Sequence, residues 1–189
     1  METKVLLAFS DVVVGYATPV VGPLSFELQA GQVIGLGGSN GSGKSTLLRA
    51  VTGLSQVFSG SIQRAEGLTI VHQWQRPELP PELALLGSEL YALLGADPVG
   101  APDVLRPLMK QPLSTMSGGQ FQLLQTMAAL CSPAQVVLMD EPTNNLDGKA
   151  MDALSEQLKQ IEPDRAVILV SHEHDFLQGH CGTIIEVNR

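Results

Sequence analysis

The residues best suited to chemistry form a glycine-rich segment that ends in a lysine and a serine. It fits the pattern Gly-x-x-x-x-Gly-Lys-[Ser/Thr] and consists of Gly38, Ser39, Asn40, Gly41, Ser42, Gly43, Lys44 and Ser45. Glycines let consecutive backbone N–H groups curl around an anion, and the N-terminus of a following helix adds a favourable field. We expect the lysine to reach the β- and γ-phosphates of a nucleotide, the last serine to bind Mg²⁺, and Thr46 to contact the α-phosphate.

The neighbours of this segment favour phosphate binding over a plain turn. An apolar run at 33–36 precedes it and predicts a strand, while Leu47 and Leu48 follow it in a predicted helix at 44–52. The alternative is a strand-to-helix turn with a solvated lysine. That alternative leaves the combination of strand, motif and helix unexplained.

A second candidate is a pair of carboxylates at the end of an apolar run. Residues 136–139 are apolar and are followed by Asp140, Glu141 and Pro142. Two adjacent carboxylates repel each other and need a cation or a function. We expect Asp140 to hold Mg²⁺ through water and Glu141 to act as the general base on the attacking water. The alternative, a solvated start of a loop, is weak in a chain that also carries a phosphate loop.

The third candidate is a tetrapeptide between these two motifs. Its residues are Ser117, Gly118, Gly119 and Gln120. Glycines at the start of a helix expose N–H groups, which makes a second anion site. Taken alone, the tetrapeptide is equally consistent with a plain helix N-cap followed by a glycine turn.

The order of the three motifs resembles that of the ATP-binding cassette (ABC) ATPases, and the resemblance covers nearly the whole chain. The tetrapeptide at 117–120 matches the signature of that family. The resemblance implies an ATPase that uses ATP and Mg²⁺. It also implies a head-to-tail homodimer, or a pseudo-dimer with a related ATPase, in which each nucleotide lies between the phosphate loop of one copy and residues 117–120 of the other. A monomer should then hydrolyse ATP poorly.

The same resemblance assigns roles to single residues. Tyr16 matches the aromatic residue that stacks on adenine, and His172 matches the histidine that contacts the γ-phosphate. Gln73, with Gln75 as the alternative, matches the glutamine that senses Mg²⁺ and water. Asp147 ends a loop that contacts the nucleotide and the other copy. One departure is the absence of arginine from 121–130, which concerns salt bridges on the helix surface and not the nucleotide contacts.

Hydrophobic patterning supplies the elements that must position these residues. Apolar runs predict strands, several of them buried on both faces, at 5–9, 12–14, 33–36, 68–71, 136–139, 166–170 and 183–187. Helical patterns lie at 44–52, 118–131 and 149–161. This alternation predicts a mostly parallel central sheet with helices on it. Glycine and proline punctuate residues 15–31 and favour an N-terminal antiparallel β subdomain.

The predicted fold class is α/β, the P-loop NTPase fold of ABC ATPases, with residues 1–189 forming a single ABC ATPase domain. A proline-rich segment around a helix-like run at 83–95 predicts a small helical lobe, which is inserted in the catalytic core at approximately 76–132. Apolar residues in that run, with Tyr91, either line a groove for a permease helix or pack the lobe. After His172 we expect only a final strand and no regulatory domain.

Composition limits the partners and the compartment. A net charge of −8 with 11 basic residues argues against a nucleic-acid partner. Cys131 and Cys181 lack Cys-x-x-Cys spacing, which is consistent with a reduced cytosolic compartment. The sequence contains no run of about 18 apolar residues, the length that would be needed to cross a membrane. We therefore expect a cytoplasmic protein that is peripheral on the cytoplasmic face of the cell membrane, held there by an integral membrane permease subunit.

Four functions fit the ABC resemblance to different degrees. The first is the motor subunit of an ABC transporter, which binds and hydrolyses ATP to drive transport through a separate permease. The second is a soluble ABC ATPase that acts on ribosomes, because 142–147 and 171–177 resemble that branch; it normally has two ATPase units in one chain. A chromosome-maintenance ATPase would need long coiled coils. A degenerate regulator does not explain why Glu141 and His172 are both present.

Overall fold

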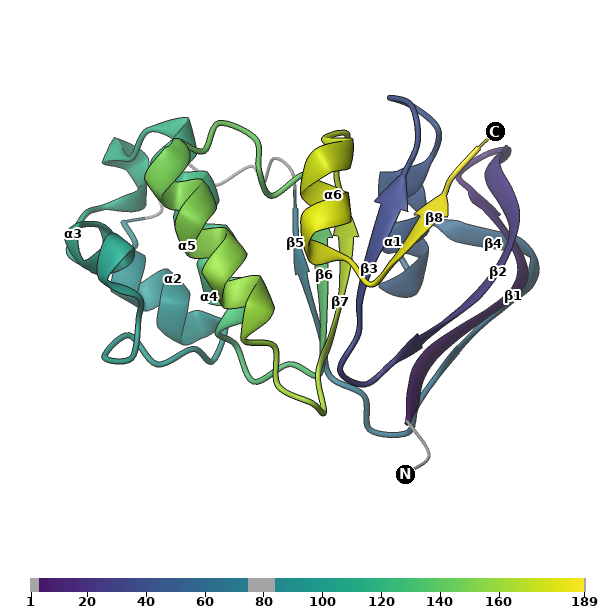
Figure 1. Cartoon of the computed structure of the whole chain (residues 1–189), viewed down its shortest axis with the longest axis horizontal. Helices are drawn as coiled ribbons and strands as arrows, with labels where there is room; N and C mark the ends of the chain where they lie inside the picture. The colour runs from purple at the N-terminus through teal and green to yellow at the C-terminus, as the bar shows by residue number, and fades with distance from the viewer. Residues whose placement is uncertain (1–3, 75–83, 189) are drawn as a thin grey trace.

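The computed structural model describes residues 4–74 and 84–188, and its elements form three layers side by side (Figure 1). A helical lobe lies at one end, a parallel sheet in the middle and an antiparallel sheet at the other end. Helix α1 (Lys44–Val51) lies between the two sheets. The arrangement confirms the predicted fold class of a parallel sheet with helices and an antiparallel β subdomain.

The antiparallel sheet has the strand order β2-β1-β4. Its members are β1 (Val5–Gly15), β2 (Pro19–Gln29) and β4 (Gln56–Arg64). The runs predicted at 5–9 and 12–14 are one strand, interrupted by a bulge at Asp11, which has a φ of 46°. Gly60 makes room for the bulge, because a Cβ there would lie 2.2 Å from the carbonyl oxygen of Ser10.

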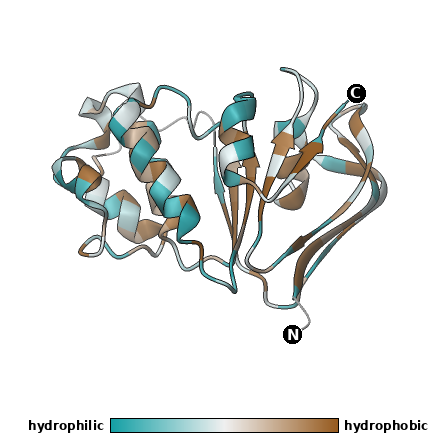
Figure 2. Cartoon of the chain, viewed as in Figure 1, coloured by the Kyte–Doolittle hydropathy of each residue, from teal (hydrophilic) through white to brown (hydrophobic). Residues whose placement is uncertain are grey.

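The five strands of the central sheet are all parallel, in the order β5-β6-β7-β3-β8. They are β3 (Val33–Gly37), β5 (Ile70–Gln73), β6 (Val136–Asp140), β7 (Ala166–Val170) and β8 (Thr183–Glu186). Every residue of β6 and β7 is buried, and Figure 2 shows these strands as hydrophobic. Parallel strands end at the same edge of a sheet, so the residues after β3, β5, β6 and β7 meet there.

The helical lobe packs on its own apolar side chains. Its elements are α2 (Gly87–Leu93), the 3₁₀ turns η1 (Asp103–Leu105) and η2 (Leu113–Thr115), α3 (Arg106–Met109) and α4 (Gly118–Leu130). The helical run expected at 83–95 is shorter, at 87–93, and residue 83 lies outside the described part of the chain. Tyr91 is 0% exposed and belongs to the hydrophobic core. The hypothesis that Tyr91 lines a docking groove is therefore wrong.

Helix α4 lies inside the molecule along most of its length. Residues 122–130 are all buried, including Gln122, Gln125 and Thr126. The stretch without arginines therefore packs in the core of this protein, where an unpaired guanidinium would be costly. The sequence suggested that surface salt bridges are lost at these positions, but buried positions could not have formed them.

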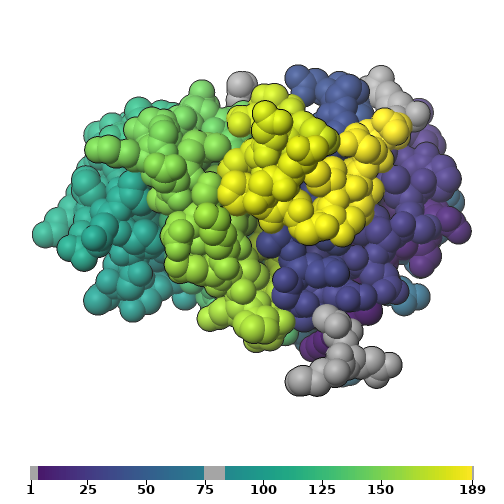
Figure 3. Space-filling view, viewed as in Figure 1, coloured from purple at the N-terminus to yellow at the C-terminus, as the bar shows by residue number. Residues whose placement is uncertain are grey.

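The C-terminal part contains more structure than expected. Helix α5 (Gly148–Lys159) agrees with its prediction to within two residues, but α6 (His174–His180) occupies a region where only a strand was expected. Helix α6 packs against strand β3, and strand β8 pairs with β3 in the sheet. Figure 3 shows the C-terminal segment beside N-terminal residues on one face of the molecule. Strand β5 lies at 70–73 instead of 68–71.

Candidate nucleotide-binding site

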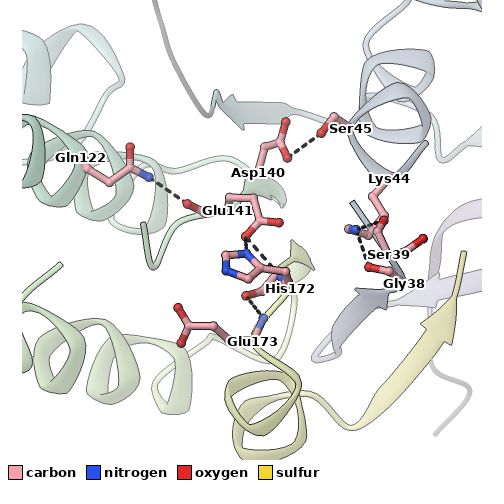
Figure 4. A network of polar contacts seen from close by, with 10 residues as sticks. Gly38, Ser39, Lys44, Ser45, Gln122, Asp140, Glu141, His172 and Glu173 are labelled. Atoms are coloured by element: carbon pink, nitrogen blue, oxygen red, sulfur yellow. Dashed lines mark hydrogen bonds and ion pairs between the residues drawn. The ribbon is translucent and has the colours of Figure 1, made fainter. Parts of the chain in front are cut away.

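The phosphate loop connects β3 to α1 with its lysine folded back over it. Lys44 is 6% exposed, and its Nζ donates to the carbonyl oxygens of Gly38 at 2.7 Å and Ser39 at 3.0 Å (Figure 4). Gly43 has a φ of 106°, and a Cβ there would lie 2.7 Å from Cβ of Val21. The loop can adopt this path only with glycine at that position. A buried cation is thus held at the centre of an amide-rich turn.

The first two predicted magnesium ligands are in direct contact. The Ser45 hydroxyl donates to Oδ1 of Asp140 at 2.9 Å, and Asp140 is 2% exposed (Figure 4). The pKa of Asp140 is raised above its ordinary value, mainly by burial. The hydrogen bond from Ser45 opposes this rise, and the neighbouring Glu141 adds to it. A buried carboxylate beside a second one is stabilised by a cation. Two hard oxygen donors with room for water suit Mg²⁺, so these residues fit the ion.

The proposed general base is paired with the predicted histidine. Glu141 is 7% exposed, and its Oε2 lies 2.8 Å from Nδ1 of His172 and accepts from the His172 backbone N–H at 3.3 Å (Figure 4). The backbone N–H of Glu141 also donates to the carbonyl of Val170 at 3.0 Å. Adjacent strands β6 and β7 therefore bring together two residues that lie far apart in the sequence.

These groups surround one cavity of about 510 Å³. Its lining combines the phosphate loop with residues that follow β6 and β7 and with residues of the β subdomain: Tyr16, Val20, Asn40, Gly41, Gly43, Lys44, Ser45, Thr46, Glu141, Asn144 and His172. Tyr16 is 45% exposed at the mouth, where a flat ring can receive a base. Asn144 was not anticipated, although it lies between the predicted Glu141 and Asp147.

Gln73 lies at the end of β5 and is 1% exposed. Its Nε2 donates to the carbonyl oxygen of Trp74 at 2.8 Å, and Nε2 of Gln125 donates to the same oxygen at 2.8 Å. Within residues 4–74 and 84–188, Oε1 of Gln73 has no hydrogen-bond partner. A buried acceptor of this kind suits a metal-bound water. The alternative, Gln75, lies outside the described residues.

The signature residues lie at a different cavity, of about 380 Å³. Ser117 Oγ accepts from the N–H of Gln120 at 3.2 Å, and Oε1 of Gln120 accepts from the N–H of Ser117 at 2.9 Å. This capping box confirms that Ser117 is the N-cap of α4, as the alternative interpretation of the tetrapeptide expected. Asp147 caps α5 by accepting from the N–H of Ala150 at 2.9 Å and lines the same cavity. One chain therefore does not bring the signature to its own phosphate loop.

The two signature glycines should respond differently to alanine. A Cβ on Gly119 would lie 2.3 Å from the carbonyl oxygen of Asn145, whereas a Cβ on Gly118 meets nothing within 4 Å. We expect Gly119→Ala to lower the free energy of unfolding by about 1–3 kcal/mol through overpacking. Gly118→Ala is the matched control and should be neutral or stabilising by up to about 1 kcal/mol. Urea unfolding of the nucleotide-free protein checks both, and equal midpoints would contradict the contact.

A stack of side chains beside the cavity was not anticipated. Arg49 Nη1 donates to the Tyr16 hydroxyl at 2.7 Å, and its guanidinium lies 5.6 Å from the ring centroid of Trp74. Trp74 in turn stacks on His72 with centroids 4.2 Å apart. Burial, followed by the Arg49 charge, lowers the pKa of His72 to about 4. The residues come from the turn after β1, from α1 and from the end of β5, so no local pattern could reveal the stack.

His72 should make the protein sensitive to acid. Its pKa falls from 6.5 to about 4 on folding, so the unfolded chain binds a proton between those values while the native state does not. Stability is therefore lost as pH falls from about 6.5 towards 4. Both ring nitrogens lack hydrogen-bond partners in the described part of the chain, and phenylalanine keeps the stack on Trp74. His72→Phe should raise the thermal midpoint more at pH 5 than at pH 7.5; an equal change at both would exclude His72 as the cause.

Comparisons with known proteins agree with this arrangement. The family model described as ABC transporter matches residues 21–144. The protein "Zinc import ATP-binding protein ZnuC" of Photorhabdus laumondii is 31% identical over 97% of this chain and 75% of its own length. The protein of the same name from Yersinia enterocolitica is 32% identical over 100% of this chain and 78% of its own.

Solved structures agree on the fold. The chain superposes on "Structure of ATP binding subunit of ABC transporter" with a TM-score of 0.83 at 24% identity, covering 97% of this chain and 86% of the other. A putative ABC transporter ATP-binding protein from Pyrococcus furiosus gives a TM-score of 0.79 at 21% identity, covering 96% of both chains. The resemblance drawn from the motifs is confirmed. The chain belongs to the ABC transporter family, among the ATP-binding subunits whose ATPase activity is coupled to transport.

Proposed function

We propose that this chain, as the ATP-hydrolysing motor of a transporter, works as a Mg²⁺-dependent head-to-tail pair attached to a separate membrane permease. The observation that carries the proposal is the separation of two cavities in one chain. The phosphate loop, Glu141 and His172 line one, while Ser117, Gly119 and Gln120 line the other. A nucleotide held by both sets requires two copies, each contributing one set.

Each residue in or next to the first cavity has a distinct task in hydrolysis. Lys44 and the loop N–H groups bind the β- and γ-phosphates, while Tyr16 stacks on adenine. Ser45 and Asp140 hold Mg²⁺, which would neutralise charge that develops on the phosphates. Glu141 removes a proton from water, and His172 fixes its carboxylate and faces the γ-phosphate. The amide oxygen of Gln73, which has no hydrogen-bond partner within residues 4–74 and 84–188, would accept from a water bound to that ion.

The signature of a second copy completes the site. Gly118 and Gly119 begin α4, a helix of 13 residues whose N-terminal N–H groups favour an anion. Asp147 lies in the same cavity and joins the contact between copies. Turnover per chain should therefore rise with protein concentration until the pair forms, and a mixture with an excess of Lys44→Met chains should lower it.

The permease is the second partner. In the part of the chain that the structure describes, no helix is long and apolar enough to cross a bilayer. We place the chain at the cytoplasmic face of the membrane, as a single domain over residues 1–189 with the helical lobe at approximately 76–132 turned towards the permease. The relatives named for zinc import make zinc uptake the first cargo to test. The translation role considered from the sequence is not favoured by these relatives.

Co-purification tests this assignment. A tagged chain expressed together with the membrane protein encoded beside its gene should be recovered in a detergent-stable complex with raised ATPase activity. Reconstituted vesicles should then take up zinc only with ATP present on the side of this subunit. Glu141→Gln serves as the control, since it should assemble but neither hydrolyse nor transport. Recovery with ribosomes and without a membrane protein would overturn the proposal.

A further inference from the structure

Helix α4 contacts the catalytic edge of the sheet through two buried amides. Gln122 is 5% exposed, and its Nε2 donates to the backbone carbonyl of Glu141 at 3.2 Å (Figure 4). Gln125 is 7% exposed and donates to the carbonyl of Trp74. Residues three apart share one face of a helix. The helix that begins at the signature is therefore tied to the ends of β6 and β5.

The backbone of Glu141 needs such support. Its φ is 54°, in the left-handed region that residues with a side chain rarely adopt. A conformation of this kind persists where the surrounding contacts over-determine it. Strand β7 holds the Glu141 N–H through Val170, and Asn144 N–H donates to the carbonyl at a long 3.3 Å. In the part of the chain that the structure describes, Gln122 provides the side-chain donor to that carbonyl.

We propose that Gln122 is a positioning residue for the reaction: its amide holds the carbonyl of Glu141 and thereby fixes where the Glu141 carboxylate points. The inference rests on the proposed role of Glu141 as general base. Figure 4 shows the two bonds on opposite sides of Glu141, with Gln122 at its backbone and His172 at its carboxylate. Without the hydrogen bond from Gln122, the Glu141 carboxylate is still present but its orientation is no longer fixed. Catalysis is sensitive to small misplacements of this kind.

Gln122→Met is the principal test. It keeps the length and buried volume of the side chain but removes the donor. If the free energy of one neutral hydrogen bond is lost entirely from the transition state, the rate falls about tenfold. We expect kcat to fall about tenfold in the permease complex, with KM for ATP and the Kd of Mg-ATP changed less than about twofold, since Gln122 does not itself line the cavity that binds nucleotide.

The matched control is Thr126→Val on the same helix. Thr126 is 0% exposed, and within the described residues its hydroxyl has no partner. Valine has the same shape as threonine, and Thr126 is not among the residues that line either cavity. Its kcat should equal that of the wild type. An equal loss of kcat in both variants, or unchanged kcat in Gln122→Met, would overturn the proposal.

Gln122→Glu supplies a readout that a purely structural role would not move. A protonated carboxyl can donate to the Glu141 carbonyl, whereas an ionised one cannot. The ratio of its kcat to that of wild type should therefore rise as pH falls, while the ratio for Gln122→Met stays constant. Parallel pH profiles for the two variants would refute the donor role. If wild type itself fails to hydrolyse ATP, or Glu141→Gln retains turnover, the proposed function fails instead.

Discussion

Glu141→Gln should reduce ATP turnover at least about a hundredfold and leave nucleotide binding intact, because a general base contributes about 10²–10⁴ in rate. Glutamine has the same shape, and its amide oxygen can still accept from the His172 backbone N–H that Glu141 contacts at 3.3 Å. The 7% exposed site is therefore preserved while the proton acceptor is lost. With hydrolysis blocked, the pair formed on Mg-ATP should accumulate.

Phosphate release, calorimetry with Mg-ATP and size-exclusion chromatography together check this expectation. The matched control is Glu173→Gln, because Glu173 is exposed and its side chain points away from Glu141 in Figure 4. That variant should hydrolyse ATP at the wild-type rate. Turnover in Glu141→Gln within a few-fold of wild type would mean that another group takes the proton.

Much of this site could be predicted from sequence because its chemistry is local. Each part of the site stands at the end of an apolar strand: the phosphate loop after β3, the carboxylates at the end of β6 and the histidine after β7. An apolar run in the sequence predicts such a buried strand. Once the strands are parallel, their carboxyl ends must meet. The Ser45 hydroxyl and Oδ1 of Asp140 therefore lie 2.9 Å apart although 95 positions separate the two residues in the sequence.

What the sequence could not reveal depends on contacts between distant segments. Strand β4 is mostly exposed and lacks an apolar run, so only its pairing with β1 identifies it. The short helix α6 follows a polar stretch with no clear period. Arg49 and Gln122 are residues of types that are ordinary in a helix, and their contacts with Tyr16 and Trp74, and with Glu141, cross long sequence distances. Their roles depend on the tertiary structure.

Lys44→Met should abolish detectable ATP binding at micromolar nucleotide and with it turnover. Lys44 is the cation held over the phosphate loop, and each hydrogen bond to a charged group contributes about 1.5–3 kcal/mol, so losing its contacts to phosphate weakens binding by at least about tenfold to a hundredfold. Methionine retains the apolar stem in a site that is 6% exposed.

The nucleotide-free fold should tolerate this change. Among the residues that the structure describes, the Lys44 amine donates to two loop carbonyls, those of Gly38 and Ser39, which water can reach once the amine is gone. Thermal unfolding should therefore change little in buffer alone, whereas the stabilisation that Mg-ATP gives the wild type should disappear. Lys159→Met, at the exposed end of α5, is the matched control and should keep that stabilisation. A Lys44→Met protein that Mg-ATP still stabilises would show that the loop binds phosphate through its backbone alone.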